Sequence, residues 1–303
     1  MADVVEALTR LGGVARRSQL RRACSRRRLC WALEVGAVAR IARGRYALPA
    51  ADAGRVAASR LNGAASHTSA ALHWGWAVKT APPRPHVTVP KHRTVEAGRR
   101  SGATVHFRDL GPDDVVDGWV TSRVRTVIDC CLDPPFDEAL AVFDSSWRAG
   151  LKPREVQLAA LRLPPRARRK VMAVARAADR RAANLFESVL RAIVMSVAGL
   201  QVEAQVTISD DAFFARVDLA DEALCIVIEA DSFEFHATRK AFDRDCRRYN
   251  GLVVRGWLVI RVSWEQVMFE PGEVAAILRA AVDQQRRRAG PAGRSLVRPR
   301  RTA

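Results

Sequence analysis

The feature that most constrains this chain is the stretch from Ala215 to His236, ARVDLADEALCIVIEADSFEFH. Two apolar runs within it, Val217–Ala220 and Leu224–Ala230, flank a three-residue polar break. Apolar runs of this length around a polar turn predict two strands joined in a hairpin. This part of the chain is therefore expected to belong to a buried sheet.

Three carboxylates interrupt or close these strands. Asp218 lies in the first, and Glu229 and Asp231 end the second. Residues two apart on a strand share a face, so Glu229 and Asp231 point the same way, and Asp218 lies across the hairpin within reach of both. Burying unpaired carboxylates is costly unless a cation such as Mg²⁺ supplies charge. Pattern alone slightly favours the other interpretation, a solvated rim at the strand ends.

The flanking segments extend the pattern to a mixed α/β domain. Residues 184–198 predict an amphipathic helix that carries Glu187, and residues 205–208 a short strand. A basic helix over 237–249 and a strand over 256–264 follow. The expected order is helix, three strands, helix, strand.

Residues from about 182 to 282 resemble small endonucleases related to the very-short-patch-repair mismatch endonuclease, within the PD-(D/E)xK superfamily. The matching pieces are FES at 186–188, RVDLA at 216–220, VIEAD at 227–231, His236, DRDCRR at 243–248 and GWLVIRVSW at 256–264. Asp231 stands where the superfamily's Lys is common. The resemblance implies a restriction-endonuclease-like α/β domain over residues 182–285.

That resemblance also implies hydrolysis of DNA phosphodiester bonds with Mg²⁺ or Mn²⁺. Asp218 and Glu229 would hold the metal, and Asp231 would complete or orient its ligand shell. His236 would act as general acid or base, or position the phosphate. Glu187 would hold the attacking water or a second metal.

Two basic residues of the predicted helix, Lys240 and Arg244, would neutralise the bound DNA backbone. A solvated helix face accounts for Arg244 equally well. The net charge of +18 over 303 residues favours a polyanionic partner, with DNA the first candidate. Arg is far commoner than Lys, so part of this excess is also typical of a GC-rich genome.

The first 50 residues predict a winged helix-turn-helix. Helices are expected over Val4–Leu11, Gln19–Ala23 and Arg26–Val35, with Ser18 and Ser25 as candidate caps. Strands are expected over Val38–Ile41 and Arg45–Leu48 around a Gly turn.

In that geometry the third helix enters the major groove, with Arg26, Arg27 and Arg28 at its start. The wing residues Arg43 and Arg45 would contact phosphate. Small basic helical domains also serve as protein-binding modules, which remains the alternative.

This region is similar to the N-terminal domain of AbiEi-type antitoxins, the repressor partners in type IV toxin–antitoxin systems. The similarity continues into a middle α/β module over 51–160. It is carried by GGVARRSQL at 12–20, residues 25–49, SHTSAAL at 66–72, PHVTVP at 85–90, VHFRDL at 105–110 and VTSRVRTVIDCC at 120–131. It implies a cognate toxin as a possible partner and a non-catalytic transcriptional regulator as the alternative function.

Five histidines of the middle module match no zinc-binding spacing, and the sequence argues against a metal site there. These are His67, His73, His86, His92 and His106.

The remaining boundaries follow from composition. Residues 161–181 predict a basic connector and helix after Pro164-Pro165, and residues 286–303 a disordered basic tail. Six cysteines without a regular framework predict reduced thiols and a cytoplasmic chain. No apolar stretch approaches the roughly 20 residues that span a bilayer, and the N-terminus lacks a signal-peptide pattern.

Overall fold

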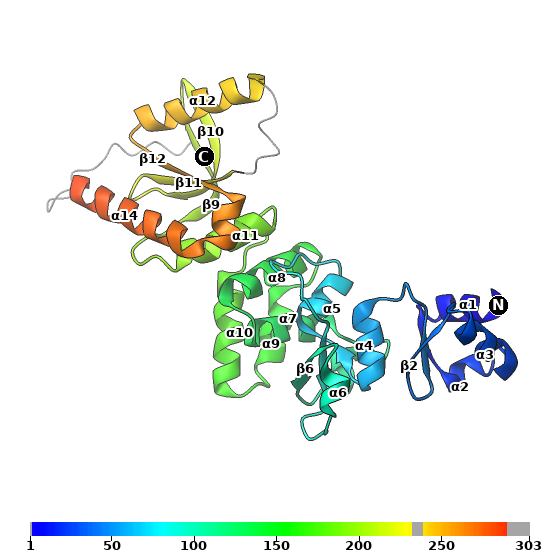
Figure 1. The fold of residues 1–303 in the computed structure, drawn as a ribbon. Helices are drawn as coiled ribbons and strands as arrows, with labels where there is room; N and C mark the ends of the chain where they lie inside the picture. Colours follow the sequence, from blue (N-terminus) through cyan, green and yellow to red (C-terminus); the bar gives the residue numbers. More distant parts are fainter. Residues whose placement is uncertain (1, 232–238, 290–303) are drawn as a thin grey trace. The chain divides into compact units, whose positions relative to one another are not determined.

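The computed structural model describes residues 2–231 and 239–289 of the chain (Figure 1). It is a mixed α/β chain with three sheets. It divides into two compact units: an N-terminal unit of Met1–Pro134 with Ala149–Ala173, and a C-terminal unit of Pro135–Arg148 with Val174–Ala303. Each unit is described on its own below.

The first 50 residues form three helices and a three-stranded sheet of order β1-β3-β2. The elements are α1 Ala2–Arg10, β1 Val14–Arg16, α2 Arg17–Leu20, α3 Arg26–Glu34, β2 Ala39–Ala42 and β3 Arg45–Ala47. Ser25 caps α3 as predicted, because its hydroxyl accepts a hydrogen bond from the Arg28 backbone N–H at 3.4 Å. The expected Ser18 cap is wrong, since α2 already begins at Arg17.

The rest of the N-terminal unit is built around a five-stranded sheet of order β6-β5-β4-β8-β7. Its strands are β4 Ala64–Ala65, β5 His86–Val89, β6 Thr104–Phe107, β7 Val115–Val116 and β8 Val120–Thr121. Its helices are α4 Ala53–Leu61, α5 His67–His73, α6 Ala97–Arg100, the 3₁₀ turn Pro112–Asp114, α7 Arg123–Leu132, α9 Pro153–Ala160 and α10 Pro165–Ala177, the last ending in the C-terminal unit.

The C-terminal unit contains a four-stranded sheet of order β12-β11-β10-β9. The elements are α8 Phe136–Arg148, α11 Leu185–Met195, β9 Glu203–Asp210, β10 Phe213–Asp221, β11 Ile226–Asp231, α12 Arg239–Val254, β12 Leu258–Ser263, α13 Trp264–Phe269 and α14 Pro271–Ala289. Strands β10 and β11 form the predicted hairpin, and β12 runs parallel to β11. The expected order of helix, three strands, helix and strand is therefore confirmed.

Two apolar layers enclose this sheet. Helices α11 and α14 pack on one face, where Leu190 and Leu278 meet Ile228. Helix α12 covers the other face, where Leu252 meets Val217. The sheet is buried on both faces, as its continuous apolar runs indicate.

The structure differs from the predicted boundaries in two places. Residues 135–148, which we expected in the middle module, form α8 and group with the C-terminal unit. The basic helix that we expected within 161–181 is present as α10. Helix α14 continues to Ala289, so the predicted tail starting at Arg286 begins inside a helix; residues 290–303 lie outside the described part.

All six cysteines are free thiols in the structure. In the part of the chain that the structure describes, no helix is both long and apolar enough to cross a bilayer.

Candidate functional site

The C-terminal unit holds a cavity of about 590 Å³, lined by its central strands β10 and β11 and by residues of α11, α12 and α13. We call it the carboxylate pocket, because Glu187, Asp218, Glu229 and Asp231 all line it. The sequence named these four residues, and the structure brings all of them to one cavity. Arg244 and Arg248 of α12 line the same cavity and give it a cationic side.

Strand pairing explains why Asp218 and Glu229 meet. Leu219 pairs with Ile228 in the antiparallel hairpin, which sets Asp218 opposite Glu229. The Asp218 Oδ2 atom accepts a hydrogen bond from the Ala230 backbone N–H at 2.9 Å. Asp218 is therefore held against the second strand by the backbone itself.

An irregularity in the neighbouring strand brings Glu187 into the same group. Strands β9 and β10 pair on both sides of Gln205, whereas Gln205 itself is unpaired in the ladder and has a φ of 56°. Its side-chain amide donates to Asp218 Oδ1 and to Glu187 Oε2, each at 3.3 Å. Such strand irregularities re-aim side chains next to functional sites. No pattern in the sequence predicts this bridging amide.

Glu187 is fixed from its own helix as well. Asn184 caps α11 by accepting a hydrogen bond from the Glu187 backbone N–H at 3.0 Å. The Ala183 backbone N–H donates to Glu187 Oε2 at 2.9 Å. Burial raises the pKa of Glu187, and the negative charge of Asp218 raises it further.

Glu229 is the most buried of these acids, with 4% of its surface exposed. Burial raises the pKa of its carboxyl to about 8; the Arg248 guanidinium lowers it, and Asp218 raises it again. Arg248 lies 3.3 Å from Glu229 Oε1, yet this oxygen has no hydrogen-bond partner in the described part of the chain. A buried carboxylate oxygen without a hydrogen-bond partner is a position where a cation would be stabilised, and Arg248 supplies part of that charge.

The carboxylate of Asp231 is paired with a different arginine from that of Glu229. It forms an ion pair with Arg261, whose guanidinium stacks on the Tyr249 ring 4.2 Å from the ring centre. Among the described residues, Asp218, Glu229 and Asp231 do not form a group of three ligand atoms within 4.8 Å of one another. Asp218 and Glu229 still fit Mg²⁺, because this ion usually takes one or two carboxylates and completes its shell with water and phosphate oxygens.

Of the other predicted residues in this unit, Arg244 is exposed and lines the pocket. His236 lies outside the described residues. Lys240 lies in α12, but its side chain is also outside the described part.

The pKa of Glu229 gives a pH-dependent prediction for the metal-free protein. A folded-state pKa near 8 against about 4.5 when unfolded means that folding favours the protonated acid. Stability from this group is complete below about pH 4.5 and is lost as the pH rises through 8. Glu229→Gln removes this pH-dependent loss of stability, so in EDTA the stability of the variant relative to the wild type should rise by about 3 to 4 kcal/mol between pH 5 and pH 8. Urea unfolding at both pH values checks this, and parallel curves for the two proteins would contradict it.

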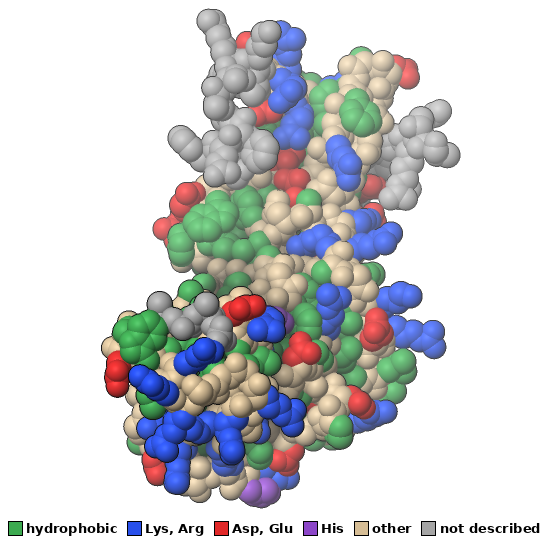
Figure 2. Space-filling view, turned by 90° about the vertical axis from the view of Figure 1, so that its right-hand side faces the viewer, with side chains coloured by type: hydrophobic (Ala, Val, Ile, Leu, Met, Phe, Trp, Pro, Cys, Tyr) green, Lys and Arg blue, Asp and Glu red, His purple; other side chains and the backbone are tan. Residues whose placement is uncertain are grey.

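The predicted DNA-contacting arginines lie in the N-terminal unit. Arg26, Arg27 and Arg28 are exposed on the first turn of α3. In Figure 2, Lys and Arg side chains gather on the lower part of the surface nearest the viewer, over the N-terminal elements. Arg43 is exposed as well, whereas Arg45 is half-buried and donates to the Ser59 hydroxyl at 3.0 Å.

A second set of arginines, which the sequence did not single out, joins these two wing residues. A cavity of about 560 Å³, the arginine pocket, is lined by Arg43, Arg45, Arg60 and Arg99 and by no carboxylate. Burial lowers the pKa of Arg45, and the charges of Arg16, Arg93 and Arg99 lower it further. Such a concentration of like charge favours an anionic ligand.

No family model and no curated protein sequence matches this chain. A search of solved structures found a similarity to the crystal structure of the RV2827C protein from Mycobacterium tuberculosis. The two chains share 15% identity with a TM-score of 0.39, over 58% of this chain and 75% of the other. A likeness of this degree carries no argument about function.

Proposed function

We propose that this chain is a DNA-binding protein whose C-terminal unit is a metal-dependent endonuclease of the PD-(D/E)xK superfamily. The observation that carries this proposal is the carboxylate pocket. There Asp218 faces Glu229 across a hairpin, and Gln205 ties Glu187 to Asp218. Two acids on adjoining strands beside an acid on a preceding helix agree with the resemblance to very-short-patch-repair endonucleases.

Asp218 and Glu229 would hold Mg²⁺ or Mn²⁺, which when bound lowers the pKa of a water and stabilises charge on the scissile phosphate. Glu187, fixed by its helix cap, would orient the attacking water. The guanidiniums of Arg244 and Arg248 would hold the phosphate and offset its charge. Asp231 would act through Arg261, holding that side chain at the edge of the pocket. His236 remains the proposed general acid or base.

The first 50 residues would act as a winged helix-turn-helix. Helix α3 would enter the major groove with its exposed arginines first, and the hairpin β2–β3 would serve as the wing. The arginine pocket would take a backbone phosphate, because its four guanidiniums meet no carboxylate within its lining. The N-terminal unit would thus position the C-terminal unit on duplex DNA.

The triple substitution Arg26→Ala, Arg27→Ala and Arg28→Ala is expected to weaken duplex binding about tenfold or more. It should also flatten the dependence of affinity on salt, because each lost phosphate contact removes about 0.9 from the logarithmic slope. Fluorescence anisotropy titrations at several salt concentrations measure both quantities. The matched control replaces three exposed arginines elsewhere, Arg162, Arg166 and Arg169, with Ala. Equal losses in both triple variants would contradict a DNA-reading helix.

The alternative is a non-catalytic regulator of the AbiEi antitoxin type that represses its own operon and partners a toxin. One observation favours this alternative: the arginine pocket and the exposed arginines of α3 could bind DNA without the carboxylate pocket. Incubating the purified protein with supercoiled, linear and mismatched DNA, with Mg²⁺, Mn²⁺ or EDTA, separates the two functions. The endonuclease cuts at least one substrate when metal is present, whereas the regulator binds DNA and leaves it intact.

A further inference from the structure

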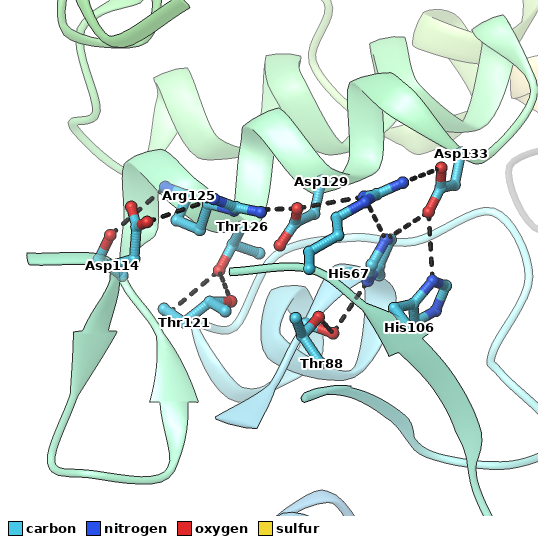
Figure 3. A network of polar contacts seen from close by, with 12 residues as sticks. His67, Thr88, His106, Asp114, Thr121, Arg125, Thr126, Asp129 and Asp133 are labelled. Carbon is cyan, nitrogen blue, oxygen red and sulfur yellow. Dashed lines mark hydrogen bonds and ion pairs between the residues drawn. The ribbon is translucent and has the colours of Figure 1, made fainter. Parts of the chain in front are cut away.

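Three imidazoles from three different elements meet inside the N-terminal unit (Figure 3). His67 opens α5, His86 opens β5, and His106 lies in the parallel neighbour β6. One ring nitrogen of each lies within 4.8 Å of the others. The His86 Nδ1 and His106 Nε2 atoms are 2.9 Å apart. We call this group the histidine cluster.

Asp133, which follows α7, contacts two of the three rings. Its Oδ2 atom lies 2.8 Å from His67 Nε2 and 3.2 Å from His106 Nδ1, and Figure 3 shows both rings turned toward this carboxylate. On the other side of its ring, His67 Nδ1 lies 2.9 Å from the Ser66 hydroxyl oxygen, which accepts a hydrogen bond from Thr88. An imidazole fixed through its second nitrogen is typical of metal-binding histidines.

The charges around the cluster are mixed: the Arg108 guanidinium lies 3.4 Å from His67 Nε2, whereas the ion-pair network around it is negative overall. Asp114, Asp129 and Asp133 are joined to Arg108 and Arg125 by ion pairs, which leaves one net negative charge from three acids and two bases. Asp129 Oδ2 is buried without a hydrogen-bond partner in the described part of the chain.

We propose that His67, His86 and His106 bind one divalent transition-metal ion of the zinc class, with water as the fourth ligand. Asp133 would orient the rings of His67 and His106. Imidazole nitrogens suit Zn²⁺, Co²⁺ or Ni²⁺, whereas Mg²⁺ prefers an all-oxygen site. Tetrahedral Zn–N bonds of about 2.1 Å place neighbouring nitrogens about 3.4 Å apart, so small ring rotations from the 2.9 Å separation suffice. The metal would tie α5, β5 and β6 together. It is independent of the carboxylate pocket and of the proposed nuclease activity.

The test uses untagged full-length protein, stripped with a chelator, dialysed and then loaded with Zn²⁺ or Co²⁺. Elemental analysis after gel filtration should find about one Zn²⁺ per chain, as a single four-coordinate site requires. Zinc should raise the melting temperature by about 5 °C. Any shift caused by an equal concentration of Mg²⁺ should be the same in the wild type and in variants of the cluster histidines. The spectrum of the Co²⁺ form should show tetrahedral ligand-field bands without the charge-transfer band of a thiolate, which excludes the six free cysteines as ligands.

The variants His86→Gln and His106→Gln should each lose most of the bound Zn²⁺ and the melting shift. Both residues are only half-buried, so these changes are milder than any at the fully buried His67. His92→Ala, at an exposed histidine outside the cluster, is the matched control and should bind like the wild type. Far-UV circular dichroism checks that each variant is folded. The proposal would be overturned if the wild type bound less than about one tenth of an equivalent of Zn²⁺. It would also be overturned if the folded Gln variants bound Zn²⁺ as the wild type does. The cluster would then be a metal-free network of hydrogen bonds.

Discussion

Asp218→Asn is expected to reduce metal-dependent DNA cleavage about 1000-fold while leaving the C-terminal unit folded. The substitution removes one negative charge from the proposed metal site at nearly constant volume. The Asn side-chain oxygen can still accept the hydrogen bond that the Ala230 backbone N–H donates to Asp218. Folding should therefore survive while metal affinity falls. Single-turnover cleavage with excess enzyme measures the chemical step without interference from product release.

Asp231→Asn is the matched control for this prediction, because it removes a carboxylate from the same cavity that is paired with Arg261. It should reduce cleavage by about tenfold at most, through the position of Arg261 and not through the metal. Glu229→Gln should behave like Asp218→Asn. Equal, small effects for all three variants would contradict the assignment of Asp218 and Glu229 as metal ligands.

The second large effect concerns stability. Asp144→Ala is expected to destabilise the C-terminal unit by about 3 to 5 kcal/mol, because it leaves the guanidinium of Arg191 buried without its counter-charge. Asp144 is fully buried, and its Oδ2 atom lies 2.5 Å from Arg191 Nη2. Its Oδ1 atom accepts a hydrogen bond from the Asp179 backbone N–H at 2.8 Å, and Arg191 also donates to the Ala177 carbonyl. This pair fastens α8 to α11 and to the segment after α10.

Denaturant unfolding followed by circular dichroism measures this loss. The control is Asp210→Asn, which breaks the exposed pair with Arg255 on the same unit and should leave the unfolding midpoint nearly unchanged. The double variant Asp144→Ala, Arg191→Met should recover part of the loss, because it removes both charges. An Asp144→Ala protein as stable as the wild type would mean that α8 is not fastened to this unit.

The sequence predicted the elements whose patterns are local. The hairpin around Asp218 and Glu229 follows from two apolar runs and a polar break, and the structure has it with the expected pairing. The hairpin β2–β3 forms around the expected Gly turn, and Ser25 caps α3 as expected. Strand periodicity also fixes which carboxylates share a face, so three of the acids in the carboxylate pocket could be named in advance.

Features that depend on distant segments could not be predicted in this way. Helix α8 has the pattern of any amphipathic helix, and its apolar packing on α11 and the buried pair of Asp144 and Arg191 assign it to the C-terminal unit. Arg60 and Arg99 join the wing arginines through tertiary packing, which leaves no spacing to detect.

The histidine cluster shows the same limit. Zinc-binding motifs that can be recognised in a sequence place their ligands a few residues apart. His67, His86 and His106 instead come from a helix and two strands. Their sequence spacing therefore argued against a metal site, although the fold brings their ring nitrogens within 4.8 Å.

The most direct measurement of the central claim is the conversion of supercoiled plasmid to nicked or linear DNA by the full-length wild-type protein. The same preparation is assayed with Mg²⁺, with Mn²⁺ and with EDTA, beside an equally folded Asp218→Asn preparation that binds the same DNA. We predict cleavage by the wild type with either metal, none in EDTA, and loss of about 99.9% of the rate in the variant. DNA that stays intact under all conditions despite tight binding, or cleavage equal in wild type and Asp218→Asn, would contradict a nuclease centred on the carboxylate pocket.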